Sequence, residues 1–140
     1  MRPGMHTRWR RQRGQSLVET ALMIWVIITV VFSVFELGWL MYTYSVLADA
    51  ANEGVRYAIV HSGGDPTGTA AKVKAFATTS MHDVSAMTVS VTCPVPPDPG
   101  GCAPPNRVRV SVTYAYIPFL PQFITAPTMH SFAEGRMVAQ

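Results

Sequence analysis

The chain has 140 residues, which suits one domain, and only 14% of them are charged, against about 25% in an ordinary soluble domain. Five of the eleven basic residues lie within the first thirteen positions, and from Gln15 onward six basic and eight acidic residues leave a net charge of −2. This distribution excludes a basic nucleic-acid-binding surface, and an apolar content of 49% excludes a disordered chain.

A long apolar segment follows the basic start, with no charged residue from Thr20 to Phe35. Residues 17–40 would form a helix of about 36 Å, which is enough to cross the ~30 Å hydrocarbon core of a bilayer. The arginines before it place residues 1–13 in the cytoplasm by the positive-inside rule, and Trp39, Tyr42 and Tyr44 lie where an aromatic belt forms at the outer interface. We therefore predict one transmembrane helix, in preference to a buried helix of a soluble protein.

A cleaved secretory signal peptide is an alternative for this N-terminus, with Ala48-Asp49-Ala50 as its cleavage site. The apolar stretch is about twice as long as the 7 to 15 residues of such a signal, and it contains Glu19 and Glu36. Cleavage there would also cut a segment that we predict to be continuous helix.

Gly14 lies at the junction between the basic leader and the apolar segment, and Glu19 follows five residues later. This arrangement resembles the prepilin signal of type IV pilins, which a membrane-embedded prepilin peptidase cleaves on the cytoplasmic side. The resemblance implies a leader of residues 1–14, cleavage after Gly14 and Gln15 as the new N-terminus. It also implies an assembly role for Glu19, because the matching glutamate of pilins pairs with the free α-amino group of a neighbouring subunit.

The two glutamates near the ends of the apolar segment are noteworthy on physical grounds as well. A carboxylate in an apolar helix costs ~2.5–3.5 kcal/mol at the bilayer centre and therefore usually has a partner. Glu19 lies in the first turns, where water is near and the helix dipole favours negative charge, so its cost is smaller. For Glu36 we consider an interfacial position at the headgroups and, as an assembly role, a polar contact with a neighbouring subunit.

Only isolated glycines interrupt the sequence between Gln15 and Val60, so we predict one long helix over residues 15–60. Several helix breakers after residue 61 end it. Beyond the membrane segment the helix is amphipathic, and Glu53 and Arg56 on its polar side are spaced for an i, i+3 ion pair. The apolar stripe comprises Ala48, Ala51, Val55, Ala58 and Ile59.

The helix also contains the run Phe35-Glu36-Leu37-Gly38 and, at residues 50–58, the stretch A-A-N-E-G-V-R-Y-A. With the leader and the Glu-containing apolar helix, these elements resemble the TadE family, minor pseudopilin-like components of the Tad (tight-adherence, Flp) pilus system. The resemblance covers roughly residues 13–58. It implies a structural minor pilin of the bacterial inner membrane that supports pilus biogenesis and adhesion, with prepilin peptidase, other pilin subunits and the Tad assembly machinery as partners. Major Flp pilins are much shorter, which favours a minor component.

We predict that residues 61–140 form a small extracytoplasmic α+β domain. A long N-terminal helix followed by such a domain is a pilin-like architecture. Residues 69–80 have an apolar side typical of a short helix, with Thr67 or Thr69 as the N-cap. Strict alternation of apolar and polar side chains predicts strands over residues 87–92 and 107–114. After a proline-rich stretch over residues 117–127, residues 131–138 are the candidate for a third strand. We expect these antiparallel strands to pack with one face on the long helix.

Cys93 and Cys102 are the only cysteines, and both lie in a proline-rich connection on the side that we place outside the cytoplasm. Oxidising compartments permit a disulfide, which here would close a ten-residue loop worth about 2.7 kcal/mol in the chain-entropy model. A metal site needs three or four suitably spaced ligands, and His82 and His130 are far away in sequence. We therefore predict a disulfide loop over residues 93–102 in preference to a metal site or free thiols.

The sequence contains no nucleophile elbow, phosphate-binding glycine loop or zinc-binding His-Glu-x-x-His motif. We therefore predict neither an enzyme nor a cofactor or metal, and we interpret His61, His82 and His130 as surface or loop residues. The alternative to a pilin is a single-pass membrane-anchored extracytoplasmic binding protein that never enters a filament. An N-terminus at Gln15 would indicate the pilin and one at Met1 the anchored protein.

Overall fold

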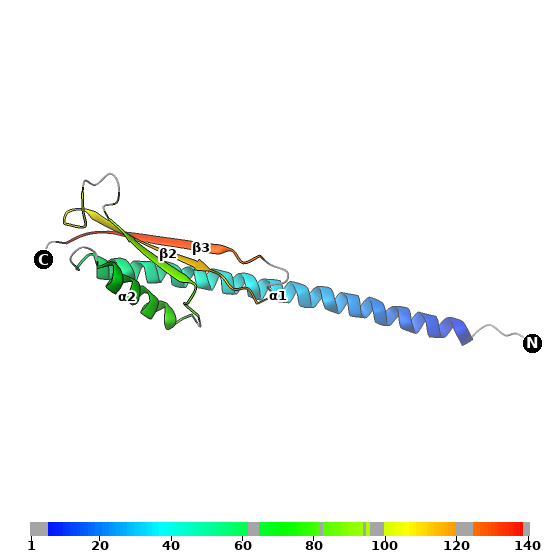
Figure 1. The fold of residues 1–140 in the computed structure, drawn as a ribbon. Coiled ribbons are helices and arrows are strands. Elements are labelled where there is room, and N and C mark those ends of the chain that lie inside the picture. The colour runs from blue at the N-terminus through cyan, green and yellow to red at the C-terminus, as the bar shows by residue number, and fades with distance from the viewer. Residues whose placement is uncertain are drawn as a thin grey trace, which may run out of the picture. The chain divides into compact units, whose positions relative to one another are not determined.

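The structure is a computed structural model that describes residues 6–61, 65–81, 83–93, 95, 100–119 and 125–138. The chain forms two compact units, Met1–Gly38 and Trp39–Gln140, and the α+β class predicted from the sequence is confirmed. Along the chain (Figure 1), the elements are α1 (His6–Ala58), α2 (Pro66–Thr78), β1 (Met87–Thr92), β2 (Arg107–Ala115) and β3 (Thr128–Arg136).

Helix α1 confirms the long helix predicted over residues 15–60, with different ends. It begins at His6 because no glycine or proline interrupts the residues from there to Gly14, and one isolated glycine costs only ~1 kcal/mol. It ends at Ala58, where the Val60 amide instead donates to the Tyr57 carbonyl at 3.4 Å, the i→i−3 contact of a closing turn. The predicted boundary between leader and helix is thus not a helix end.

The first unit contains the apolar part of α1. Every side chain from Gly14 to Phe35 is exposed in the single chain. By length and composition, the helical stretch Gly14–Ala58 is long and apolar enough to cross a membrane.

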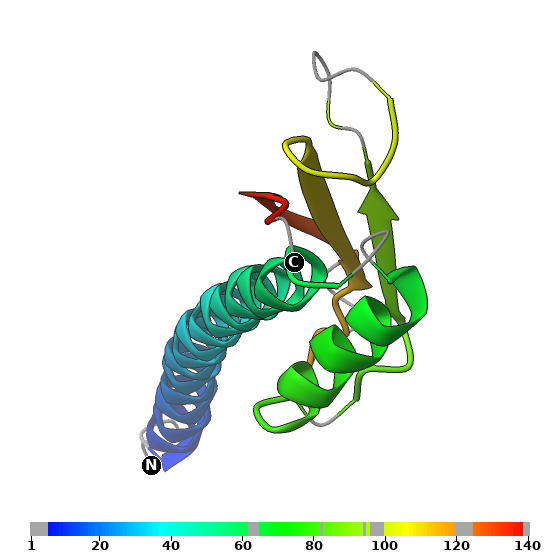
Figure 2. The same ribbon diagram turned by 90° about the vertical axis from the view of Figure 1, so that its left-hand side faces the viewer.

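In the second unit, α2 and the last turns of α1 cover one face of a three-stranded antiparallel sheet (Figure 2), in the order β1-β2-β3. Val110 at the centre of β2 pairs with Val91 of β1 and Ala133 of β3. Because side chains alternate between the two faces of a sheet, these three residues and every second residue from them point toward the helices. This face is buried, whereas the other carries Arg109 and Phe132. The one-sided sheet predicted from the sequence is therefore confirmed.

The strands match the sequence prediction unevenly. Strand β1 has the predicted bounds, and β2 is one residue longer, ending at Ala115. Strand β3 begins at Thr128 rather than at residue 131, because it pairs along the whole of β2, down to Ala115↔Thr128. It also ends earlier, at Arg136, and the Val138 amide then donates to the Ile59 carbonyl at 3.2 Å.

The predicted disulfide is present between Cys93 and Cys102, whose Cα atoms lie 5.2 Å apart. Asn106, which is 8% exposed, donates from its side-chain amide to the carbonyls of Gly100 and Gly101 at 2.6 and 2.9 Å. These bonds and the disulfide fix the described end of the loop onto the start of β2. The predictions that concern His82, Pro94 and residues 96–99 lie outside the described residues.

Helix α2 begins at Pro66 with Asp65 as its N-cap, and the predicted threonine caps are wrong. The Asp65 carboxylate accepts a hydrogen bond from the Gly68 amide at 3.1 Å and another from the Tyr57 hydroxyl at 3.2 Å. Proline suits the first helical position because its φ is already helical. Thr69 instead is completely buried in the core.

Replacing Asp65 with alanine should destabilise the second unit by about 1–2 kcal/mol, since an N-cap is lost and the residue has a φ of 31°, which alanine disfavours. Asp65→Asn is the matched control, because asparagine caps helices and tolerates positive φ. Thermal unfolding followed by circular dichroism measures both. Equal melting temperatures for the two variants would contradict the capping role.

Candidate assembly site

The first component of the candidate site is the apolar surface of α1 in the first unit. Fourteen large apolar side chains between Leu17 and Phe35 are 46–72% exposed, and they lie on all sides of the helix. Full burial of such side chains is worth about 1.5–3 kcal/mol each, so covering this surface gains on the order of 20 kcal/mol or more. A helix that is apolar all round therefore requires lipid or neighbouring helices as its surroundings.

The hydroxyl groups inside this apolar surface are satisfied within the helix. Thr20, Thr29 and Ser33 each donate to the carbonyl four residues earlier, at 2.8–2.9 Å. Hydroxyls bonded in this way add no unsatisfied donor to an apolar environment. The surface is consequently compatible with lipid on every side, apart from its carboxylate.

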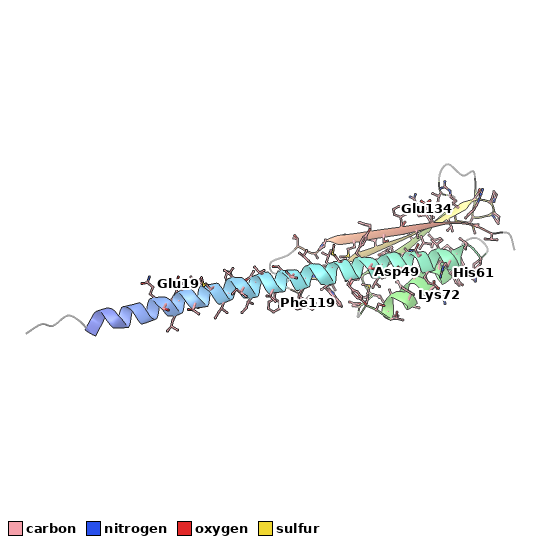
Figure 3. All side chains as sticks on the ribbon, turned by 180° about the vertical axis from the view of Figure 1, so that it is seen from behind. Glu19, Asp49, His61, Lys72, Phe119 and Glu134 are labelled. Carbon is pink, nitrogen blue, oxygen red and sulfur yellow. A yellow bond between two sulfur atoms is a disulfide. The ribbon has the colours of Figure 1, made fainter. Side chains whose placement is uncertain are left out.

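That carboxylate belongs to Glu19, which is exposed near the start of the apolar surface (Figure 3). Among the described residues it has no hydrogen-bond or ion-pair partner. Gln15 lies four residues earlier, about 6 Å along the helix axis. An amino group created at Gln15 would therefore lie about one helical turn from the Glu19 carboxylate of the same chain.

Gly14 and Gln15, the predicted processing residues, are exposed and helical. A Cβ atom built on Gly14 meets no other atom within 4 Å. The internal packing of the chain therefore does not require glycine at this position. A requirement for glycine there would have to come from another molecule that contacts it.

Glu36, the second predicted assembly residue, differs sharply from Glu19. It is 6% exposed, and it takes part in an interaction within the chain. The neighbouring Phe35 and Leu37 are 71% and 61% exposed, so the burial is confined to this residue. An assembly role for Glu36 remains a prediction.

The small residues of the A-A-N-E-G-V-R-Y-A stretch fill a crowded contact in the second unit. Ala50, Ala51 and Ala58 are completely buried. A Cβ atom on Gly54 would lie 2.5 Å from Val73 Cγ2 of α2 and 3.1 Å from Val110 Cγ1 of β2. Gly54 thus allows α1 to approach α2 and the sheet at the same point.

The charged residues of the same stretch lie on the other side of α1. Glu53 and Arg56 form the predicted i, i+3 ion pair at 3.9 Å, with Arg56 82% exposed. A pair this exposed contributes little to stability. The stretch is therefore explained mainly by close packing. The apolar stripe predicted for Ala51 and Ala58 is confirmed, whereas the packing role of Gly54 was not predicted.

His61 and His130 each have a local partner. His61 stacks on Tyr57 with ring centroids 3.7 Å apart, and its Nδ1 lies 2.7 Å from the Tyr57 carbonyl. Desolvation and then the neighbouring Asp65 carboxylate raise the pKa of the Tyr57 hydroxyl. His130 Nδ1 lies 3.1 Å from the Thr113 hydroxyl. Within the described residues there is no group of three or more histidine, cysteine, aspartate or glutamate side chains placed to hold a metal ion.

Comparison with known families gives a match to part of α1. The family model described as TadE-like protein matches residues 14–56. This is the family that the leader, the Glu-containing helix and the A-A-N-E-G-V-R-Y-A stretch resemble. The match begins at Gly14 and includes Glu19, Glu36 and Gly54, and it leaves out α2 and the sheet. No curated protein and no solved structure shows significant similarity to the chain.

Proposed function

We propose that this chain, whose residues 14–56 carry the TadE-like sequence, is a structural minor pilin of a Tad pilus, cleaved after Gly14 by prepilin peptidase and assembled through α1. The TadE-like match supports association with a Tad pilus, and the apolar helix supports attachment to a membrane. The observation that carries the finer proposal is Glu19, an exposed carboxylate without a partner among the described residues. It lies five positions after Gly14, in a segment of α1, residues 17–35, that is otherwise apolar all round.

The proposed assembly step exchanges one apolar environment for another. Before assembly, lipid covers residues 17–40 in the inner membrane, and the second unit lies on the extracytoplasmic side. In a pilus, the helices of neighbouring subunits replace the lipid. Because lipid tails are as apolar as leucine, this exchange has little hydrophobic driving force, and close packing and polar contacts decide it.

Glu19 is suited to fix the register of this packing. Cleavage after Gly14 would leave a positively charged amino group on Gln15. An ion pair between that amine and Glu19 of a neighbouring subunit forms at one axial stagger of the two helices. The apolar side chains around it tolerate several staggers, so the charged pair selects among them.

The proposal assigns no catalytic residue and no cofactor, so the second unit has a structural role and an adhesive one at most. An anchored binding protein that never enters a filament would use the same helix without cleavage. The N-terminus of the protein in its own cells separates the two functions.

The decisive experiment compares Gly14→Leu with Gly38→Leu when each is produced together with prepilin peptidase. The space at the Cβ position of both glycines is open, so a side chain can be added at either position. Intact-mass measurement and N-terminal sequencing should show an N-terminus at Gln15 for the natural chain and for Gly38→Leu, and an uncleaved chain for Gly14→Leu.

Three outcomes contradict the proposal. An N-terminus at Met1 in the natural chain indicates the anchored protein, and one at Ala51 indicates secretion. Cleavage of Gly14→Leu at the natural rate would show that processing does not depend on Gly14.

A further inference from the structure

Three aromatic rings form a cluster at the start of the second unit. The ring centroids of Trp39 and Tyr42 lie 5.4 Å apart on α1, and that of Phe119, which follows β2, lies 5.9 Å from Trp39. The Tyr42 hydroxyl donates to the Ser80 carbonyl at 3.3 Å, which links the cluster to the segment after α2. All three rings are 41–67% exposed. The cluster is therefore held in place by the fold but is open on its outer side.

The segment after β2 presents apolar side chains outward in a regular alternation. Tyr116 and Pro118 are buried, whereas Ile117 and Phe119 are 58% and 67% exposed. The Tyr116 amide donates to the Pro127 carbonyl at 3.1 Å, which ties this segment to the residues before β3. The backbone that carries Ile117 and Phe119 is thus held in place by this hydrogen bond and by the two buried side chains. No charged residue occurs in residues 116–126.

The depth of Ile117 and Phe119 relative to the bilayer follows from the position of Trp39. Trp39 is the penultimate residue of the apolar segment 17–40, so a helix that spans the bilayer places it at the outer interface. Because the Phe119 ring (labelled in Figure 3) lies beside that of Trp39, it lies near the same level. Tryptophan, tyrosine and phenylalanine side chains at this depth are suited to the headgroup boundary.

We propose that Ile117 and Phe119 insert into the outer leaflet of the membrane and, together with Trp39 and Tyr42, form a lipid-docking site that seats the second unit on the bilayer. The inference rests on the membrane insertion contained in the proposed function. Continuity with the transmembrane segment favours lipid over a second copy of the chain as the occupant.

The paired charges of the sheet lie near the start of β2, at the end away from Ile117 and Phe119, so they do not oppose lipid contact at that pair. Arg107 and Arg109 both pair with Glu134 on the outer face of the sheet, and Arg109 also lies over the Phe132 ring at 5.1 Å. Trp39, Ile117 and Phe119 also line a hollow of about 400 Å³ that has Asp83 in its wall. Because a carboxylate is costly in an apolar environment, we assign lipid contact to the outward sides of Ile117 and Phe119 and not to the floor of this hollow.

Site-specific photo-cross-linking tests the proposal with the full chain in vesicles of phosphatidylethanolamine and phosphatidylglycerol. Benzoylphenylalanine replaces Phe119 in one variant, Phe132 in a second and Trp25 in a third. Phe119 and Phe132 are matched in type and exposure, at 67% and 65%, and Trp25 at 66% lies within the apolar part of α1. After irradiation, mass spectrometry identifies lipid and protein adducts. We expect lipid adducts at positions 119 and 25 and none at 132.

The other outcomes overturn the inference in distinguishable ways. Lipid adducts at 25 without any at 119 would leave membrane insertion standing and remove the docking site. Adducts of position 119 to a second copy of the chain would assign the cluster to a subunit interface. Equal lipid labelling at 119 and 132 would show that the second unit has no fixed face toward the bilayer. Loss of lipid labelling at 25 would remove the insertion on which both proposals rest.

Discussion

Glu19→Ala should still be cleaved after Gly14 and inserted in the membrane, but it should be largely absent from assembled pili. A hydrogen bond to a charged group contributes about 1.5–3 kcal/mol, so loss of the pair with a neighbouring amine lowers incorporation roughly 10- to 150-fold. Insertion itself should improve, because the variant no longer places a carboxylate in the apolar segment. The amounts of the chain in sheared pili and in membranes, compared by immunoblotting, measure this effect.

Two further variants separate the charge from the shape of this side chain. Glu19→Gln keeps the size and loses the charge, so it should also fail to incorporate. Thr20→Ala changes the adjacent residue, whose hydroxyl bonds to the Ser16 carbonyl at 2.9 Å within its own helix, and it should assemble normally. If Glu19→Ala enters pili as well as the natural chain does, Glu19 has no assembly role, even where cleavage after Gly14 is established.

The parts of the fold that were predictable are those in which local pattern and long-range packing agree. Strand β1 alternates strictly along all of its residues, and its bounds were predicted correctly. The long helix was predictable because residues 15–58 contain an apolar run, an amphipathic stretch and no cluster of helix breakers. The disulfide followed from two cysteines in a single loop.

The remaining features depend on contacts between distant segments. The start of β3 at Thr128 is set by its pairing with Ala115 rather than by alternation in its own sequence. The capping role of Asp65 could not be predicted because this residue lies among several turn-forming residues. Such residues by themselves indicate only that a helix ends there. No local signal predicts that Phe119 lies beside Trp39, or that Glu36 is buried.

The candidate site was predictable to a different degree in each half of α1. Gly14 and Glu19 stand out because a basic leader and an apolar run frame them, so their spacing is readable without a structure. Gly54 does not stand out, since isolated glycines occur in many helices. Its importance lies in Val73 and Val110, which belong to other elements.

Gly54→Val should therefore destabilise the second unit strongly. The new Cβ atom alone would lie 2.5 Å from Val73 Cγ2 and 3.1 Å from Val110 Cγ1. Both valines are completely buried, and their branched side chains have little rotamer freedom, so they cannot move aside cheaply. Overpacking of this kind costs about 1–3 kcal/mol or more, which lowers the melting temperature by roughly 4–8 °C for each kcal/mol in a domain of this size.

Gly38→Val is the matched control, because it introduces the same side chain in the same helix with no atom within 4 Å of its Cβ position. Its melting temperature should equal that of the natural chain when unfolding in detergent is followed by near-ultraviolet circular dichroism. Gly54→Ala should lie between the two, since up to ~1 kcal/mol of helix propensity offsets part of the clash. A Gly54→Val variant as stable as Gly38→Val would mean that α1 does not pack closely on α2 and β2 at this point.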